Sequence, residues 1–178
     1  DGPARLLDVG GGHGYYSIEA CQRASNLRAT ILDAPGALGV AEAEIAAAGI
    51  GDRIETRGGD ALQDDLGGPY DVAFCFNVAH GFDPDENQVL FGRIADALAS
   101  DGRLVVLDQF AGEGRFSIQR LGLAFTGFVY NTALGGTVYE ADALEQWLLE
   151  AGFESVSTTR FRSVPGTGVL EAVASEKA

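Results

Sequence analysis

Short apolar runs alternate with amphipathic segments along the whole chain, and this alternation restricts the fold more than any other feature. The apolar runs expected to be strands cover residues 5–9, 30–33, 53–57, 70–77 and 103–108. The segments expected to be helices cover residues 15–24, 37–48, 85–100, 116–134 and 140–151. Units of about 30 residues, each a strand followed by a helix, predict a parallel sheet with helices on both faces.

The last part of the chain predicts a different strand arrangement. Residues 153–161 and 168–175 are expected to be a closing pair of strands, joined by a turn at Pro165–Gly166. The fold class expected is therefore α/β, a doubly wound seven-stranded sheet, mostly parallel with one antiparallel strand. In such sheets ligands bind beyond the carboxyl ends of the strands, which is where functional residues are expected.

Helical spacing predicts which side chains of residues 85–100 face the core. The apolar residues at that spacing, expected to be buried, are Val89, Leu90, Ile94, Ala97 and Leu98. Asp101–Gly102 is expected to end the helix before the next strand.

Composition places the chain among globular proteins, because 46% of its 178 residues are hydrophobic and 21% are charged. No apolar stretch reaches the roughly 20 residues of a membrane span. The N-terminus also lacks the pattern of a secretory signal. Two cysteines and two histidines, without metal-ligand spacing, make a metal site unexpected. We expect a single cytoplasmic domain over residues 1–178.

The net charge of −14 limits the ligands that the chain can bind. Twelve basic residues against 26 acidic ones make a nucleic-acid partner unexpected, because phosphate backbones are bound mainly through Lys and Arg. The same charge disfavours a strongly anionic substrate and would not repel a cationic cofactor.

Three alternating glycines, Gly10, Gly12 and Gly14, follow the first expected strand. A glycine-rich turn between a strand and a helix lets a nucleotide-like ligand approach the backbone closely. The dinucleotide pattern G-x-G-x-x-G would place another glycine at position 15, where this chain has Tyr15. The loop therefore favours a ligand without phosphates over a dinucleotide.

Two carboxylates follow later strands. Asp33 ends the second expected strand and can accept hydrogen bonds from the two hydroxyls of a ribose, or it can start the turn that contains Pro35. Asp60, in Gly59–Asp60–Ala61 after the third expected strand, can lie beside the exocyclic amine of an adenine, or it can cap the following turn.

These motifs, in this order, resemble the S-adenosylmethionine (SAM)-dependent O-methyltransferases of the plant caffeate and bacterial polyketide type, which act on phenols, quinones and polyketides in secondary metabolism. The matching segments are Leu6–Gly14, Ile31–Pro35, Gly51–Ile54, Gly59–Ala61, Asn77–His80 and Asp101–Val106. The resemblance covers nearly the whole chain. It implies a Rossmann-like class I methyltransferase fold, SAM as cofactor, S-adenosylhomocysteine as product and a small-molecule acceptor. It also implies that residues 1–178 are the catalytic domain, and that an N-terminal winged-helix domain outside this chain forms a homodimer.

The resemblance also implies roles for particular residues. The residues expected to bind the cofactor are Gly10, Gly11, Gly12, Asp33, Ala34, Asp60, Ala61, Phe76 and Asn77. Phe128 and Asn131 are expected to line the acceptor pocket, and His80 corresponds to the histidine that takes the proton of the acceptor hydroxyl.

The chain departs from the family around this histidine. Many members continue with Asp-Trp where this chain has Gly81–Phe82, and plant members have a glutamate after a Gly-Gly pair where this chain has Thr137. Asp108, at the end of the fifth expected strand, is by topology the nearest carboxylate for His80. It can equally serve as a cap at the strand end.

The resulting hypothesis is methyl transfer from SAM to a hydroxyl of a small aromatic or polyketide-like acceptor. Three alternatives stay open. The methyl group can go to carbon or nitrogen, the chain can be a SAM-binding protein without catalysis, or it can be an NAD oxidoreductase. Tyr15 and the Gly59–Asp60–Ala61 segment oppose the last of these.

Overall fold

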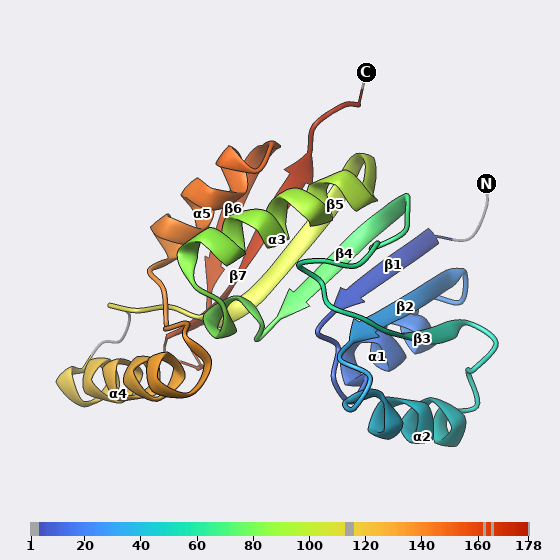
Figure 1. Ribbon diagram of the computed structural model, residues 1–178, viewed down its shortest axis with the longest axis horizontal. Coiled ribbons are helices and arrows are strands. Elements are labelled where there is room, and N and C mark those ends of the chain that lie inside the picture. The colour runs from blue at the N-terminus through green and yellow to red at the C-terminus, as the bar shows by residue number, and fades with distance from the viewer. Residues whose placement is uncertain (1–3, 113–115, 162, 165, 178) are drawn as a thin grey trace.

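The computed structural model, which describes residues 4–112, 116–161, 163–164 and 166–177, contains a seven-stranded sheet with the order β3-β2-β1-β4-β5-β7-β6 (Figure 1). The strands are β1 (Ala4–Val9), β2 (Leu27–Asp33), β3 (Ile54–Gly58), β4 (Tyr70–Phe76), β5 (Leu98–Gln109), β6 (Phe153–Arg160) and β7 (Thr167–Ala174). The helices are α1 (Tyr15–Arg23), α2 (Leu38–Ala48), α3 (Pro84–Ala97), α4 (Ser117–Leu134) and α5 (Ala141–Glu150), with a short 3₁₀ helix, η1 (Ala79–Gly81).

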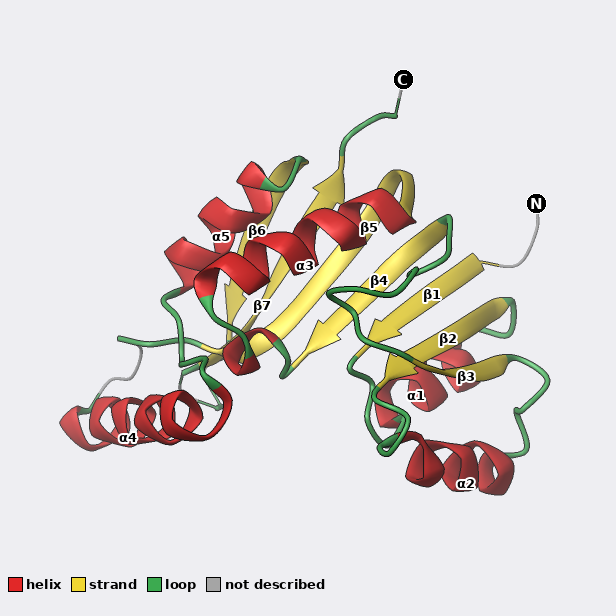
Figure 2. Cartoon of the chain, viewed as in Figure 1, coloured by secondary structure: helices red, strands yellow, loops and turns green. Residues whose placement is uncertain are grey.

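The strand directions confirm the expected fold class. Strands β1 to β5 pair in parallel, and β7 lies antiparallel between β5 and β6. Pro165, expected in the turn before β7, lies outside the described residues, whereas Gly166 has a φ of 83° as a tight turn requires. The carboxyl ends of β1 to β5 therefore meet at one edge of the sheet (Figure 2).

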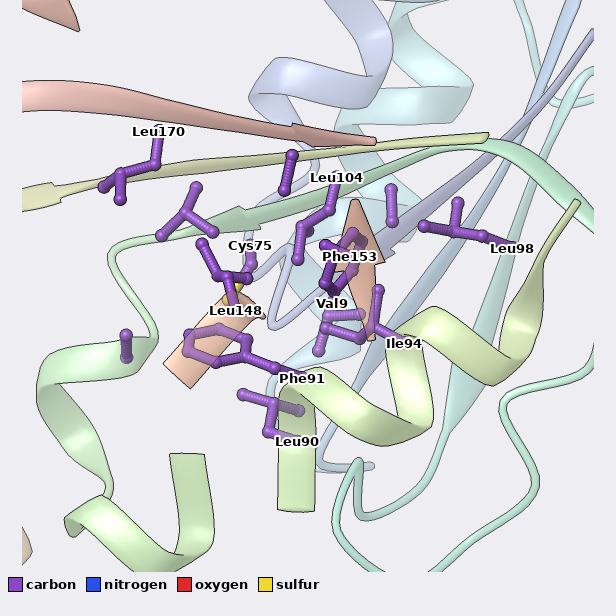
Figure 3. Packing of buried hydrophobic residues seen from close by; sticks show 14 of the residues in the cluster. Val9, Cys75, Leu90, Phe91, Ile94, Leu98, Leu104, Leu148, Phe153 and Leu170 are labelled. Carbon is purple, nitrogen blue, oxygen red and sulfur yellow. The ribbon is translucent and has the colours of Figure 1, made fainter. Parts of the chain in front are cut away.

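Helices cover both faces of the sheet. α1 and α2 pack on one face, while α3 and α5 pack on the other (Figure 1). In the layer beneath α3, Phe91 and Ile94 lie fully buried with strand residues such as Val9 and Leu104 (Figure 3). Burial on two faces explains the nearly continuous apolar runs of the central strands.

The boundary between α3 and β5 differs from the expected one. α3 begins at a capping box formed by Asp83 and Glu86 and ends at Ala97, three residues before the expected end at Ser100. β5 begins at once with Leu98, which pairs with Tyr70 of β4. The pairing then shifts register and resumes at Arg103, because the chain turns at Asp101 with a φ of 60°.

Four of the five apolar residues expected to face the core from this segment are buried as predicted, namely Leu90, Ile94, Ala97 and Leu98. The prediction for Val89 is wrong, because this residue is 50% exposed, and the buried face includes Asn87 and Phe91 in addition. Asn87, the polar residue in this buried face, contacts η1 through its side-chain nitrogen, which lies 2.9 Å from the carbonyl oxygen of Ala79.

α4 lies beyond the carboxyl ends of the strands, apart from the two layers that cover the sheet (Figure 1). Several of its apolar side chains are exposed, among them Ile118, Leu121, Phe125 and Phe128. Among the described residues, no helix combines the length and the apolarity that crossing a membrane requires.

Candidate active site

A cleft of about 550 Å³ opens at the carboxyl ends of β1, β2 and β3. It is lined by Val9, Gly10, Leu32, Asp33, Ala34, Pro35, Gly58, Gly59, Asp60, Ala61, Asp64, Val78 and Phe82. Five of these were expected to bind the cofactor, namely Gly10, Asp33, Ala34, Asp60 and Ala61. The structure thus brings the three separate sequence motifs to one cleft.

The glycine loop has a backbone that other residues would adopt only with strain. Gly10, Gly12 and Gly14 have φ values of 66°, 54° and 77°, all in the left-handed region. A Cβ atom on Gly10 would lie 2.6 Å from Cγ2 of Val78, which lines the same cleft. The loop therefore forms a cradle of bare backbone at the end of β1, as a closely approaching ligand requires.

Asp33 connects this loop to the end of β2. Its Oδ2 accepts a hydrogen bond from the backbone N–H of Gly12 at 2.8 Å, and its Oδ1 accepts one from Ala34 at 2.7 Å. The carboxylate is thereby held at the edge of the cleft, where it can also accept bonds from a ligand, because each oxygen has a further lone pair.

Asp60 lines the cleft and also organises the turn that follows it. Its carboxylate accepts hydrogen bonds from the backbone of Leu62 at 2.8 Å and from the side chain of Gln63 at 2.7 Å. Asp64 in turn accepts the backbone N–H of Asp60 at 2.8 Å. The capping role that the sequence left open is thus present in the structure.

Four of the residues expected to bind the cofactor do not line the cleft, namely Gly11, Gly12, Phe76 and Asn77. The ring of Phe76 packs edge-on against Tyr16 of α1, with centroids 4.8 Å apart, so it occupies the side of the sheet covered by α1. Asn77 has a φ of 57° and bonds through its backbone N–H to Leu107 at 2.8 Å.

A buried carboxyl group lies directly beneath the glycine loop. Asp8 of β1 is 1% exposed, and its Oδ2 accepts a hydrogen bond from Ser17 at 2.7 Å. A Cβ on Gly11 would lie 2.8 Å from this carboxyl group. Burial raises the pKa of Asp8 to about 6, the hydrogen bond from Ser17 opposes that rise, and the charge of Asp33 adds to it.

The raised pKa predicts that Asp8 costs stability as the pH increases. The folded protein holds the proton of Asp8 more tightly than the unfolded chain, so stability falls from about pH 4 to pH 6 and is level above that range. Asp8→Asn removes the titrating group, so the variant should not show this decrease in the free energy of unfolding. The decrease amounts to about 3 kcal/mol, at roughly 1.4 kcal/mol per pKa unit. Urea unfolding of both proteins at pH 4 and pH 7 measures the change in the free energy of unfolding between the two pH values. An equal change in the two proteins would contradict the prediction.

His80 and Asp108 form a pair at the ends of the neighbouring strands β4 and β5. Nδ1 of His80, in η1, lies 2.8 Å from Oδ1 of Asp108, and the backbone N–H of His80 donates to Oδ2 at 3.3 Å. Both side chains are largely buried, with 12% of the His80 side chain and 2% of the Asp108 side chain exposed. The carboxylate that topology singled out is therefore the partner of His80.

This pairing determines which ring nitrogen of His80 can accept a proton. A carboxylate beside Nδ1 favours the tautomer with hydrogen on Nδ1, because that nitrogen then donates to Asp108. Asp108 also caps its strand end, since its Oδ1 accepts the backbone N–H of Gln109 at 2.7 Å. Nε2 is left with a lone pair, as a general base requires.

α4 contributes an aromatic neighbour of His80. Tyr130 stacks on the imidazole with ring centroids 4.1 Å apart and an angle of 13° between the planes. Phe128 and Asn131, expected to line the acceptor pocket, border a separate hollow of about 370 Å³ between α4 and Val138. Phe128 is 64% exposed, so it is a wall residue of this hollow and not part of the core.

Several cleft residues were not among those expected to bind the cofactor. Val78 and Phe82 line the cleft and flank His80 in sequence, and Asp64 lines it from the turn after Asp60. The available signal was that Val78 lies within the matching segment Asn77–His80 and that Phe82 follows this segment by two residues. Among the described residues, no group of three or more His, Cys, Asp or Glu side chains could hold a metal ion.

Comparison with known proteins agrees with the fold. A family model described as a methyltransferase domain matches residues 1–158. A 3-hydroxy-5-methyl-1-naphthoate 3-O-methyltransferase from Streptomyces sahachiroi is 30% identical over 172 residues, which are 97% of this chain and 49% of that protein. An L-tyrosine C(3)-methyltransferase from Streptomyces lavendulae is 30% identical over 152 residues, 85% of this chain and 42% of that protein.

A solved structure shows the same architecture. The apo crystal structure of the SAM-dependent methyltransferase SibL superposes with a TM-score of 0.82 at 30% identity, covering 97% of this chain and 51% of that one. The chain thus spans about half the length of these relatives.

The doubly wound sheet, the bare-backbone loop after β1 and the carboxylates after β2 and β3 define a nucleoside-binding domain. The chain belongs to the SAM-dependent methyltransferase family, and residues 1–158 match the methyltransferase domain of that family.

Proposed function

We propose that the protein transfers a methyl group from SAM to a hydroxyl of a small aromatic or polyketide-like acceptor, with His80 as general base. The observation that carries the proposal is the 2.8 Å contact between Nδ1 of His80 and Oδ1 of Asp108. Val78 and Phe82 line the cleft and flank His80 in sequence, which supports a position of the base near a cofactor bound there.

The cleft suits SAM by its shape and its chemistry. A Cβ at position 10 would fill the space beside Val78, so the bare backbone supports close approach by the amino-acid part of the cofactor. Asp33 would accept hydrogen bonds from the ribose hydroxyls, and Asp60 with Ala61 would border the adenine. Bound SAM supplies a methyl group on a positively charged sulfur, ready for an in-line nucleophile.

The protein's part in the chemistry is to remove a proton from the acceptor. A phenol with a pKa near 10 is a weak nucleophile until it is deprotonated, whereas an imidazole with an ordinary pKa near 6.5 accepts protons at cellular pH. His80 would take the proton at Nε2, while Asp108 holds the ring in the required tautomer and stabilises the imidazolium that forms. Positioning by the surrounding helices supplies the rest.

The hollow beside α4 supports an aromatic acceptor. Phe128 offers a flat apolar face there, and Asn131 offers both a donor and an acceptor of hydrogen bonds. The relative from Streptomyces sahachiroi is named for methylation of a hydroxyl on a naphthoate ring, an acceptor of this kind.

Product analysis tests the proposal. The protein is incubated with SAM and a panel of hydroxylated benzoates, naphthoates and quinones, each paired with an analogue in which hydrogen replaces the hydroxyl. We expect a methyl ether, identified by NMR, from a hydroxylated member and no product from its analogue. Methylated product from the analogues would contradict transfer to the hydroxyl.

Transfer to carbon is the second candidate, because the relative from Streptomyces lavendulae is named for methylation at C(3) of tyrosine. In this reaction His80 would deprotonate the phenol, and the ring carbon beside the phenolate oxygen would accept the methyl group. That carbon would then lose its hydrogen as a proton, which restores the aromatic ring. The same panel distinguishes the two candidates, since NMR separates a methyl group on oxygen from one on a ring carbon.

A further inference from the structure

Asn87 is a fully buried polar residue on the face of α3 that packs against η1. Its side-chain nitrogen lies within hydrogen-bond distance of three backbone carbonyl oxygens, those of Ala79 at 2.9 Å, Asp83 at 3.1 Å and Phe82 at 3.2 Å. The side-chain amide of Asn87 thus contacts the backbone both before and after His80.

The orientation of this amide is determined by its neighbours. Turning it over would place Oδ1 against carbonyl oxygens, which are acceptors only, so the nitrogen must face them. In this orientation Oδ1 is buried without a hydrogen-bond partner. A buried acceptor without a partner is unfavourable, and an apolar residue at this position of α3 would avoid that cost. The side-chain N–H groups of Asn87 compensate for this cost, because they donate to backbone carbonyl oxygens within residues 79–83.

The backbone groups that Asn87 contacts lie on both sides of His80 in sequence. The carbonyl of Ala79 immediately precedes His80, and that of Phe82 follows two residues later. Phe82 also accepts a hydrogen bond from the hydroxyl of Tyr139 at 2.7 Å, and Gly136 packs so closely that a Cβ there would lie 2.2 Å from the carbonyl oxygen of His80. The backbone of this segment is therefore held from several sides.

Only Asn87 holds both sides of His80 through a single side chain among these contacts. A rotation of η1 would swing the imidazole away from Asp108, since Nδ1 lies 2.8 Å from that carboxylate on a separate strand. Holding the carbonyls before and after His80 fixes this rotation.

We propose that Asn87 is a positioning residue that sets the orientation, and thereby the tautomer, of His80. Its effect on catalysis rests on the function proposed above, whereas its effect on the imidazole does not. Restricting the peptide planes on both sides of His80 keeps Nδ1 on the carboxylate and Nε2 free.

The test uses the two histidines of the chain as reporters. Long-range ¹H–¹⁵N NMR spectra show which nitrogen of each ring carries hydrogen, and the spectrum of His80→Ala assigns the two rings. The wild type is expected to hold His80 with hydrogen on Nδ1. Asn87→Leu keeps the side chain's size but removes its donors, and Asn87→Ser retains one donor. Gln88→Ala, at the exposed neighbouring position, is the matched control.

We expect Asn87→Leu to give a mixture of His80 tautomers, with Asn87→Ser in between and the tautomer of His13 unchanged. With an acceptor in hand, kcat should fall on the order of 100-fold in the leucine variant, while KM for SAM stays constant. If the leucine variant does not fold, the serine variant supplies the same comparison. An unaltered tautomer of His80 in a folded variant, with only the melting temperature lowered, would overturn the proposal.

The outcome is separable from that of the proposed function. If His80→Ala leaves turnover intact, His80 is not the base, yet the NMR comparison still decides whether Asn87 orients it.

Discussion

Replacing His80 with alanine is expected to lower kcat by about 10²- to 10⁴-fold, the usual contribution of a general base. The effect follows from the pairing with Asp108, which leaves Nε2 as the one ring nitrogen able to accept a proton from the acceptor. The affinity for SAM should hardly change, because the His80 side chain does not line the cleft. Steady-state kinetics and calorimetry with SAM measure the two quantities separately.

His13→Ala is the matched control for this variant. His13 lies in the glycine loop, where its Nδ1 accepts the backbone N–H of Tyr15 at 3.3 Å, and no carboxylate pairs with its ring among the described contacts. We expect it to retain kcat. A wild-type kcat in His80→Ala together with unchanged SAM affinity would eliminate the base role.

Gly10→Val is expected to weaken SAM binding by on the order of 100-fold or more. A β-branched residue at a φ of 66° is strained, and such strain costs about 1–3 kcal/mol. Its Cβ would also lie 2.6 Å from Val78, so the wall of the cleft must shift, at a further cost of about 1–3 kcal/mol. Calorimetric titration with SAM measures the loss of affinity.

A second variant introduces similar backbone strain away from the cleft. Gly49 has nearly the same φ, 69°, at the end of α2, and a Cβ there would meet nothing within 4 Å. Gly49→Val should therefore lower the melting temperature and leave SAM affinity intact. If both variants bind SAM with equal affinity, the loop at Gly10 is not the cofactor cradle.

The sequence predicted the arrangement of strands because each central strand is buried on both faces and therefore apolar throughout. It did not predict the boundary between α3 and β5. Residues 98–100 continue the helical pattern, whereas in the structure Leu98 pairs with Tyr70 of β4. That contact joins segments distant in sequence, so no local pattern contains it.

The site divides in the same way. The glycine turn follows from local backbone requirements, and Asp108 follows from topology, because neighbouring parallel strands end side by side. The direction of the Phe76 ring depends on Tyr16 of α1, and the buried position of Asn87 depends on the backbone carbonyl oxygens of Ala79, Phe82 and Asp83 that its side chain contacts. An asparagine among the polar residues of a helix gives no local sign that it is buried.

The cofactor cleft and the hollow beside α4 are lined by different residues. Val78 and Phe82 contribute to the first, Phe128 and Asn131 to the second, and their described linings have no member in common. If the hollow binds the acceptor as proposed, substitutions at Phe128 or Asn131 can consequently change the choice of acceptor without replacing any residue that lines the cofactor cleft.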